Sequence, residues 1–179
     1  GPNKEVLFEL GEILPSTDRY IDLVFMSHPQ LDHYGGLKDV IDRYEVGAFI
    51  FTGKEGAGDS WLEFEKKLLD EKTDIITLMA GDKIVYGDSI ISVLSPNQAL
   101  LRNKDVNESS LVMKLESQGV KALFTGDISA ETDKHISEHY DLDVDVLKIA
   151  HHGSRYSTGS SFIEEATPAI SVIQVGQNS

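Results

Sequence analysis

The chain has 179 residues, which suits one domain, and 40% of them are hydrophobic, as in ordinary globular proteins. It has no cysteine, which excludes disulfides, thiolate-zinc sites and a cysteine nucleophile, and is compatible with either redox compartment. Its net charge of −14 is opposite in sign to the positive charge that nucleic-acid-binding proteins usually carry, although bound divalent cations can reverse the local field. No stretch approaches the ~20 apolar residues of a membrane span.

In the first 70 residues, helical patterns alternate with apolar runs. The amphipathic pattern that starts at Glu5 is stopped by Leu14-Pro15, and the next apolar run ends at Ser27-His28. We expect Ser60 to be the N-cap of the last helix of this part. The predicted elements are, in order, a helix at 5–13, a strand at 21–26, a helix from Gly35-Gly36 through Tyr44, a strand at 46–51, a glycine-rich loop at 53–59 and a helix at 60–69.

The rest of the chain is richer in strands. We expect strands at 74–78, 83–86, 89–94, 110–115 and 121–124, then a helix at 129–140, a strand at 146–150, a helix at 160–165 and a strand at 169–175. A β-meander flanked by alternating helices and strands predicts two sheets covered by helices, and not a single doubly wound sheet. We treat residues 1–179 as one domain of the α/β class.

Four of the six histidines, His28, His33, His151 and His152, fall at the ends of predicted strands. Strand ends are rigid and face open space, as active sites require. His28-Pro29-Gln30-Leu31-Asp32-His33 packs two imidazoles and a carboxylate into a tight loop, which suits one or two divalent ions. Taken alone, the loop is also compatible with an exposed polar turn in which Asp32 caps the following helix.

Two further elements complete the pattern. An apolar strand runs into Thr125-Gly126-Asp127, and a second one runs into His151-His152-Gly153-Ser154. Asp127 is a candidate bridge between two metals, although a plain strand-end turn is the better explanation of Phe124-Thr125-Gly126-Asp127 taken alone. Adjacent residues of an extended chain point to opposite sides, so one histidine of the pair is expected to be a ligand and the other a supporting group or general acid.

The order HPQLDHYGG, TGD, HHGS resembles the metallo-β-lactamase superfamily, and most closely its branch with the hydrolase domain of ComEC-type competence proteins and free-standing bacterial relatives. The resemblance runs from Val6 to Ser179. It implies a metallo-β-lactamase-like αββα sandwich with metal ligands His28, Asp32, His33, Asp127 and His151. For Asp32 the resemblance implies a ligand or a group that orients the attacking water, and for Asp127 a bridge between the metals. His152 is the candidate general acid.

Three departures from the family pattern bear on the metal. Gln30 stands where the family has its second histidine, and no histidine lies in the segment 107–110. Both losses favour oxygen ligands, which makes Mn²⁺ or Mg²⁺ a rival to Zn²⁺. The usual N-terminal hairpin and the histidine after a segment like Val175-Gly176-Gln177-Asn178 are also missing, so we expect a fragment of the family fold.

The sequence therefore predicts a hydrolase with one or two divalent ions, Zn or Mn, that cleaves phosphodiesters of DNA or RNA. One alternative is hydrolysis of a small-molecule ester, thioester or β-lactam, because the same chemistry can attack an acyl carbon. Another is a non-catalytic, metal-bound or DNA-engaging module. The His135-x-x-Glu138-His139 pattern resembles an inverted zinc-peptidase motif, but its polar surroundings favour an exposed helix.

Overall fold

The polypeptide divides into two compact units, Gly1–Thr77 (unit 1) and a second that begins at Leu78 (unit 2). The computed structural model describes residues 1–176, so Gln177 and Asn178 of the predicted C-terminal segment lie outside the described residues. Each unit has its own sheet and its own apolar core. The prediction of one domain over residues 1–179 stays a prediction.

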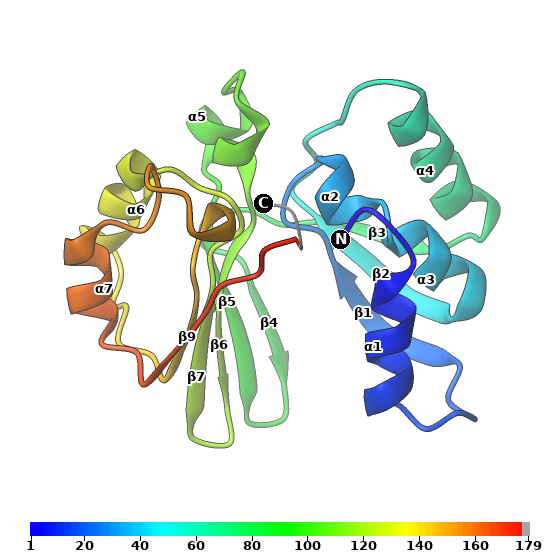
Figure 1. Ribbon diagram of the computed structural model, residues 1–179, viewed down its shortest axis with the longest axis horizontal. Coiled ribbons are helices and arrows are strands. Elements are labelled where there is room, and N and C mark those ends of the chain that lie inside the picture. The colour runs from blue at the N-terminus through cyan, green and yellow to red at the C-terminus, as the bar shows by residue number, and fades with distance from the viewer. Residues whose placement is uncertain (177–179) are drawn as a thin grey trace. The chain divides into compact units, whose positions relative to one another are not determined.

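Unit 1 is built on a three-stranded parallel sheet in the order β1-β2-β3. Parallel strands need crossover connections, which helices supply here, and Figure 1 shows α3 and α4 beside the strands that they connect. The elements in chain order are α1 (Glu5–Ile13), β1 (Tyr20–Phe25), α2 (Leu31–Tyr34), α3 (Leu37–Arg43), β2 (Glu45–Phe51), α4 (Asp59–Asp70) and β3 (Asp74–Thr77).

Aromatic side chains fill the core of unit 1. Phe49 of β2 packs edge-on against Phe64 of α4 at 5.4 Å between ring centroids, and Trp61 lies 5.2 Å from Tyr34. Phe64 has no exposed surface, and Trp61 is also buried. Burial of each side chain of this size stabilises the folded protein by roughly 1.5–3 kcal/mol. The aromatic cluster therefore fixes α2 and α4 on the sheet. Leu62, on the same helix, is exposed.

Unit 2 contains a mixed six-stranded sheet in the order β4-β5-β6-β7-β8-β9. The first four strands are antiparallel, which confirms the predicted meander, whereas β8 and β9 continue the sheet in parallel. The elements are β4 (Lys83–Tyr86), β5 (Ser89–Ser95), α5 (Gln98–Leu101), η1 (Val106–Ser109), β6 (Val112–Ser117), β7 (Val120–Phe124), α6 (Ala130–Ser137), β8 (Val146–Lys148), η2 (His151–Gly153), α7 (Ser160–Ala166) and β9 (Ile170–Val172).

Helices α6 and α7 share one side of this sheet (Figure 1). Ile136 of α6 and Phe162 of α7 pack with Leu123 and Leu147 of the central strands, and all four side chains are buried. This core holds the ends of β7 and β8, from which the predicted Asp127 and His151-His152 follow. Among residues 1–176, no helix has the length and apolar character to cross a membrane.

The structure corrects three local predictions. Asp32 and His33 lie in the short helix α2 and not in a loop, because the Gln30 carbonyl accepts the amides of His33 and Tyr34. Ser60 is not the N-cap of α4: Gly58 holds that position, and the Ser60 hydroxyl accepts from Lys38 Nζ. The His151-His152 pair is not extended, since both residues have positive φ, +49° and +54°, within a 3₁₀ turn.

Candidate metal centre

The three predicted metal ligands of unit 1 lie together at the end of β1. The strand pairing continues one residue beyond β1, where the Met26 amide donates to Ile50 O, and the chain then turns through Ser27 to Gln30 into α2. His28 precedes this turn, while Asp32 and His33 follow it on the first turn of α2. A rigid strand end and a helix start thus position side chains that are up to five residues apart in the sequence.

Short contacts define what we call the His28 cluster: Ser27, His28, Asp32 and His33. The rings of His28 and His33 have centroids 4.1 Å apart and are tilted by 47°. Ser27 Oγ lies 3.1 Å from Nδ1 of each ring, and His33 Nε2 lies 3.6 Å from Asp32 Oδ2. His28 is completely buried, whereas the Asp32 side chain is 47% exposed.

The donor set of this cluster fits a divalent transition metal. Imidazole nitrogen and carboxylate oxygen are the ligands that zinc accepts in the absence of cysteine, and they also suit manganese. Metal-bound histidines characteristically give their second ring nitrogen to a neighbouring oxygen, and Ser27 Oγ is such an oxygen for both rings. The residues therefore match the expected cofactor in type and in surroundings.

The Asp127 cluster of unit 2 consists of Asp127, Lys148 and His152. Asp127 is buried and has a cation-forming group on each side, with Oδ2 3.2 Å from His152 Nε2 and Oδ1 3.8 Å from Lys148 Nζ. Burial lowers the pKa of Lys148, and the Asp127 carboxylate acts in the opposite direction. His152 Nδ1 donates to the Gln174 carbonyl at 2.7 Å, because a carbonyl can only accept.

His151 is held mainly through its backbone. Its amide donates to Gly126 O at 3.2 Å, and its ring centroid lies 6.2 Å from that of His152. Within unit 2, the ring that reaches the Asp127 carboxylate is that of His152. Our assignment of His151 as ligand and His152 as general acid stays a prediction.

Side chains that the sequence reading did not single out hold the Asp127 turn in place. Ser110 Oγ accepts the Asp127 amide at 3.1 Å, and Glu108 Oε1 accepts the Ser129 amide at 3.2 Å. Glu108 Oε2 also accepts a short hydrogen bond from the Thr132 hydroxyl. The segment 107–110, noted for its lack of a histidine, thus supports Asp127 from behind, and no local sequence signal marks that role.

Asp133 is a second such residue, on the buried side of α6. Burial raises the pKa of its carboxyl to about 7, the backbone amides of Thr158 and Gly159 act to lower it, and the nearby Glu108 acts to raise it. Those amides end the segment that begins with His151 and His152. This segment also contains Thr158 with φ of +48°, so three of its non-glycine residues are in the left-handed region, which persists only where surrounding contacts enforce it.

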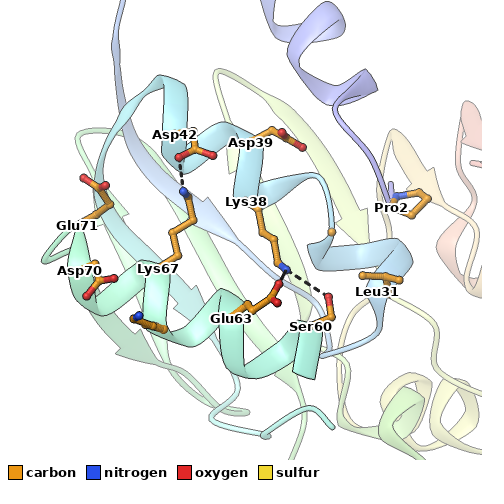
Figure 2. A pocket seen from close by; sticks show the side chains of 12 residues that line it. Pro2, Leu31, Lys38, Asp39, Asp42, Ser60, Glu63, Lys67, Asp70 and Glu71 are labelled. Carbon is orange, nitrogen blue, oxygen red and sulfur yellow. Dashed lines mark hydrogen bonds and ion pairs between the residues drawn. The ribbon is translucent and has the colours of Figure 1, made fainter. Parts of the chain in front are cut away.

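A separate groove of about 650 Å³ lies between α3 and α4 of unit 1 (Figure 2). Charged side chains that pair with one another line it: Lys38 Nζ contacts Glu63 Oε2 at 3.1 Å, and Lys67 pairs closely with Asp42. None of the predicted site residues lines the groove. Its polar, internally paired walls do not resemble the apolar lining of a typical small-molecule site.

Comparison with known proteins shows the family to which this chain belongs. The family model described as "Beta-lactamase superfamily domain" matches residues 8–177. The chain is 28% identical to ComE operon protein 3 of Bacillus subtilis, over 98% of the chain and 23% of that protein. It is 24% identical to Recombination protein 2 of Haemophilus influenzae, over 93% of the chain and 19% of that protein. The chain thus spans a quarter or less of these relatives.

Solved structures agree on the fold. The metallo-β-lactamase fold protein YhfI of Bacillus subtilis superimposes with a TM-score of 0.61, at 15% identity, over 97% of this chain and 73% of that one. The two sheets with their covering helices are therefore those that the motifs predicted. The chain belongs to the β-lactamase superfamily and has the metallo-β-lactamase fold.

Proposed function

We propose that this chain is a metal-dependent hydrolase that cleaves phosphodiesters, with DNA or RNA as its substrate. The observation that carries the proposal is the His28 cluster, in which two imidazoles and a carboxylate lie together at a strand end. His28, Asp32 and His33, together with Asp127 and His151, are the proposed ligands of one or two divalent ions, as in the family pattern. Zn²⁺ and Mn²⁺ are the ions that this donor set suits.

A bound divalent ion would supply a more acidic water and a Lewis acid for the substrate oxygens. In the proposed mechanism, side chains orient the water and transfer the protons. Asp32 is about half exposed, so its carboxylate can accept a proton of the attacking water and orient it. His152 Nε2 is 3.2 Å from Asp127 Oδ2 and is the proposed proton donor to the leaving oxygen. Lys148 offsets part of the Asp127 charge.

Two considerations favour a phosphodiester over an acyl substrate. Gln30 replaces a histidine of the family pattern, which shifts the donor set towards oxygen and towards ions that serve phosphoryl chemistry. One of the similar proteins is named Recombination protein 2, and recombination acts on DNA. That name supports a DNA substrate for this chain. The net charge of −14 opposes DNA binding, so we expect cleavage to depend strictly on the divalent ion.

The first test is metal content. Elemental mass spectrometry on protein purified without added metal, and again after exposure to Mn²⁺ and Zn²⁺, should find a stoichiometric ion that falls in Asp127→Ala. The ion found is then used in assays with single-stranded DNA, duplex DNA and bis(p-nitrophenyl) phosphate. Absence of metal in the wild-type protein under every condition would overturn the proposal.

Replacing Asp32 provides the catalytic test. Asp32→Ala should lower phosphodiester cleavage by about 100-fold or more, the usual contribution of a proton-handling group, with an unchanged circular dichroism spectrum. Glu131→Gln, an exposed position on α6, is the charge-matched control and should cleave at the wild-type rate. Full activity of Asp32→Ala refutes the mechanism, and turnover of a chromogenic cephalosporin without DNA cleavage would assign an acyl substrate instead.

A further inference from the structure

Ser27 has no role in the proposed chemistry, yet it makes the most specific contacts of the His28 cluster. Ser27 lies two residues after the end of β1, and its side chain is partly buried. One oxygen atom, Ser27 Oγ, lies 3.1 Å from His28 Nδ1 and 3.1 Å from His33 Nδ1. A single hydroxyl thus bridges two rings that are five residues apart in the sequence.

The bridge restricts the tautomers of both histidines. A neutral imidazole carries its proton on one nitrogen and a lone pair on the other, and only the lone pair can bind a metal. A hydroxyl oxygen has two lone pairs and can accept two hydrogen bonds. If both Nδ1–H groups donate to Ser27 Oγ, both Nε2 atoms keep their lone pairs.

The competing arrangement is less suited to a metal. A hydroxyl that donates to one Nδ1 and accepts from the other would leave one ring protonated at Nε2. That ring would have to lose or move its proton before it could coordinate an ion through Nε2. Because the two rings are close, with centroids 4.1 Å apart, only small ring rotations are open to correct the wrong tautomer.

We propose that Ser27 is a positioning residue that accepts hydrogen bonds from Nδ1–H of both His28 and His33, and so presents both Nε2 atoms to the metal. This inference rests on the proposed function for the identity of the ligands, but its first consequence holds in the metal-free protein. The hydroxyl preorganises two ligands from different local structures, because His28 lies in the turn after β1 and His33 lies in α2.

The test combines tautomer state with metal affinity. Long-range ¹H–¹⁵N spectra of metal-free, ¹⁵N-histidine-labelled protein, recorded at about pH 8 where ordinary imidazoles are neutral, should show Nδ1–H tautomers for both rings. In Ser27→Ala, at least one of the two rings should shift towards the Nε2–H form. Zn²⁺ affinity, from competition with a chromophoric chelator, should fall by about 10- to 100-fold, the usual effect of removing such a partner.

Two variants separate positioning from general damage. Ser27→Thr keeps the hydroxyl and should retain both tautomers and the wild-type Zn²⁺ affinity. Ser60→Ala removes the same atom from α4, where it accepts from Lys38, and should change neither readout. The inference is overturned if Ser27→Ala keeps both tautomers and its Zn²⁺ affinity, or if either ring of the wild type is in the Nε2–H form.

These readouts also separate this inference from the proposed function. Wild-type protein with both Nδ1–H tautomers and tight Zn²⁺ binding, but no cleavage of any phosphodiester, would refute the hydrolase and leave the role of Ser27 intact. Phosphodiester cleavage that survives in Ser27→Ala, with both tautomers unchanged, would refute the role of Ser27 and leave the hydrolase intact.

Discussion

Asp133 offers the most quantitative test of the structure, because its carboxyl is buried within unit 2 and only 1% exposed. Burial raises its pKa from the ordinary 3.8 to about 7. Replacing it with asparagine keeps the shape of the side chain and removes the ionisation. The change therefore isolates the cost of placing a negative charge beside the segment that carries His151 and His152.

The magnitude follows from the two pKa values. Below the unfolded value of 3.8, both states hold the proton and the group contributes nothing to pH dependence. Above it, the unfolded chain ionises while the folded chain stays protonated, so stability falls by about 1.4 kcal/mol per pH unit until the folded value of about 7. The full span is about 4 kcal/mol. Above the folded pKa, this loss is complete.

At about pH 5, little more than a third of this pH range has been crossed, so Asp133→Asn should be more stable than the wild type by roughly 1.5–2 kcal/mol. At about pH 8 the difference should reach up to ~4 kcal/mol. Urea titrations at both pH values, followed by far-UV circular dichroism, measure the difference. The single tryptophan, Trp61, lies in unit 1, so its fluorescence would report the wrong unit. Hydrogen exchange of peptides from α6 and residues 150–159 then localises the effect.

Glu131→Gln on the same helix is the matched control, because it removes the same charge from an exposed position. It should keep the wild-type pH dependence. If Asp133→Asn also keeps that dependence, or is the less stable protein at about pH 8, then Asp133 is hydrated or paired in solution and the reasoning from burial is wrong.

Three further predictions concern other side chains. Glu108→Ala should destabilise the protein by about 2–4 kcal/mol in the same urea titrations, because it leaves the Ser129 amide and the Thr132 hydroxyl without their acceptor; a loss below about 0.5 kcal/mol would contradict this. Gln30→His should raise Zn²⁺ affinity in chelator competition, and unchanged affinity would show that position 30 does not face the ion. Replacing His135 and His139 with alanine should leave metal content unchanged by elemental mass spectrometry, whereas a fall would reveal a metal site on α6.

Local sequence patterns were sufficient for most of the secondary structure. The predicted helix at 5–13 and the strand at 83–86 have the observed bounds, and the two-sheet arrangement is confirmed. These features depend on hydrophobic periodicity and on proline or glycine stops, which are written in neighbouring residues. The helix α2 escaped prediction because four residues are too few to show a helical period.

Most of the candidate metal ligands could also be recognised from short stretches of sequence. His28, Asp32 and His33 lie within six residues, so the sequence alone could group them, and the structure brings these three together in unit 1. The order of the three motifs supplied the family. By contrast, no sequence pattern indicates that His152 is the histidine in contact with Asp127. That contact depends on the left-handed backbone of the turn, which overrides the alternation expected of an extended chain.

The supporting residues were decided by tertiary structure alone. Glu108 reaches the Ser129 amide across 21 positions of sequence, and Asp133 of α6 lies against the amides of Thr158 and Gly159, which precede α7. Hydrogen bonds between distant segments leave no periodicity or spacing in the sequence, because they form only once the core has set the segments side by side. The sequence therefore determined which groups are available for chemistry, and the packed fold determined which groups hold them in place.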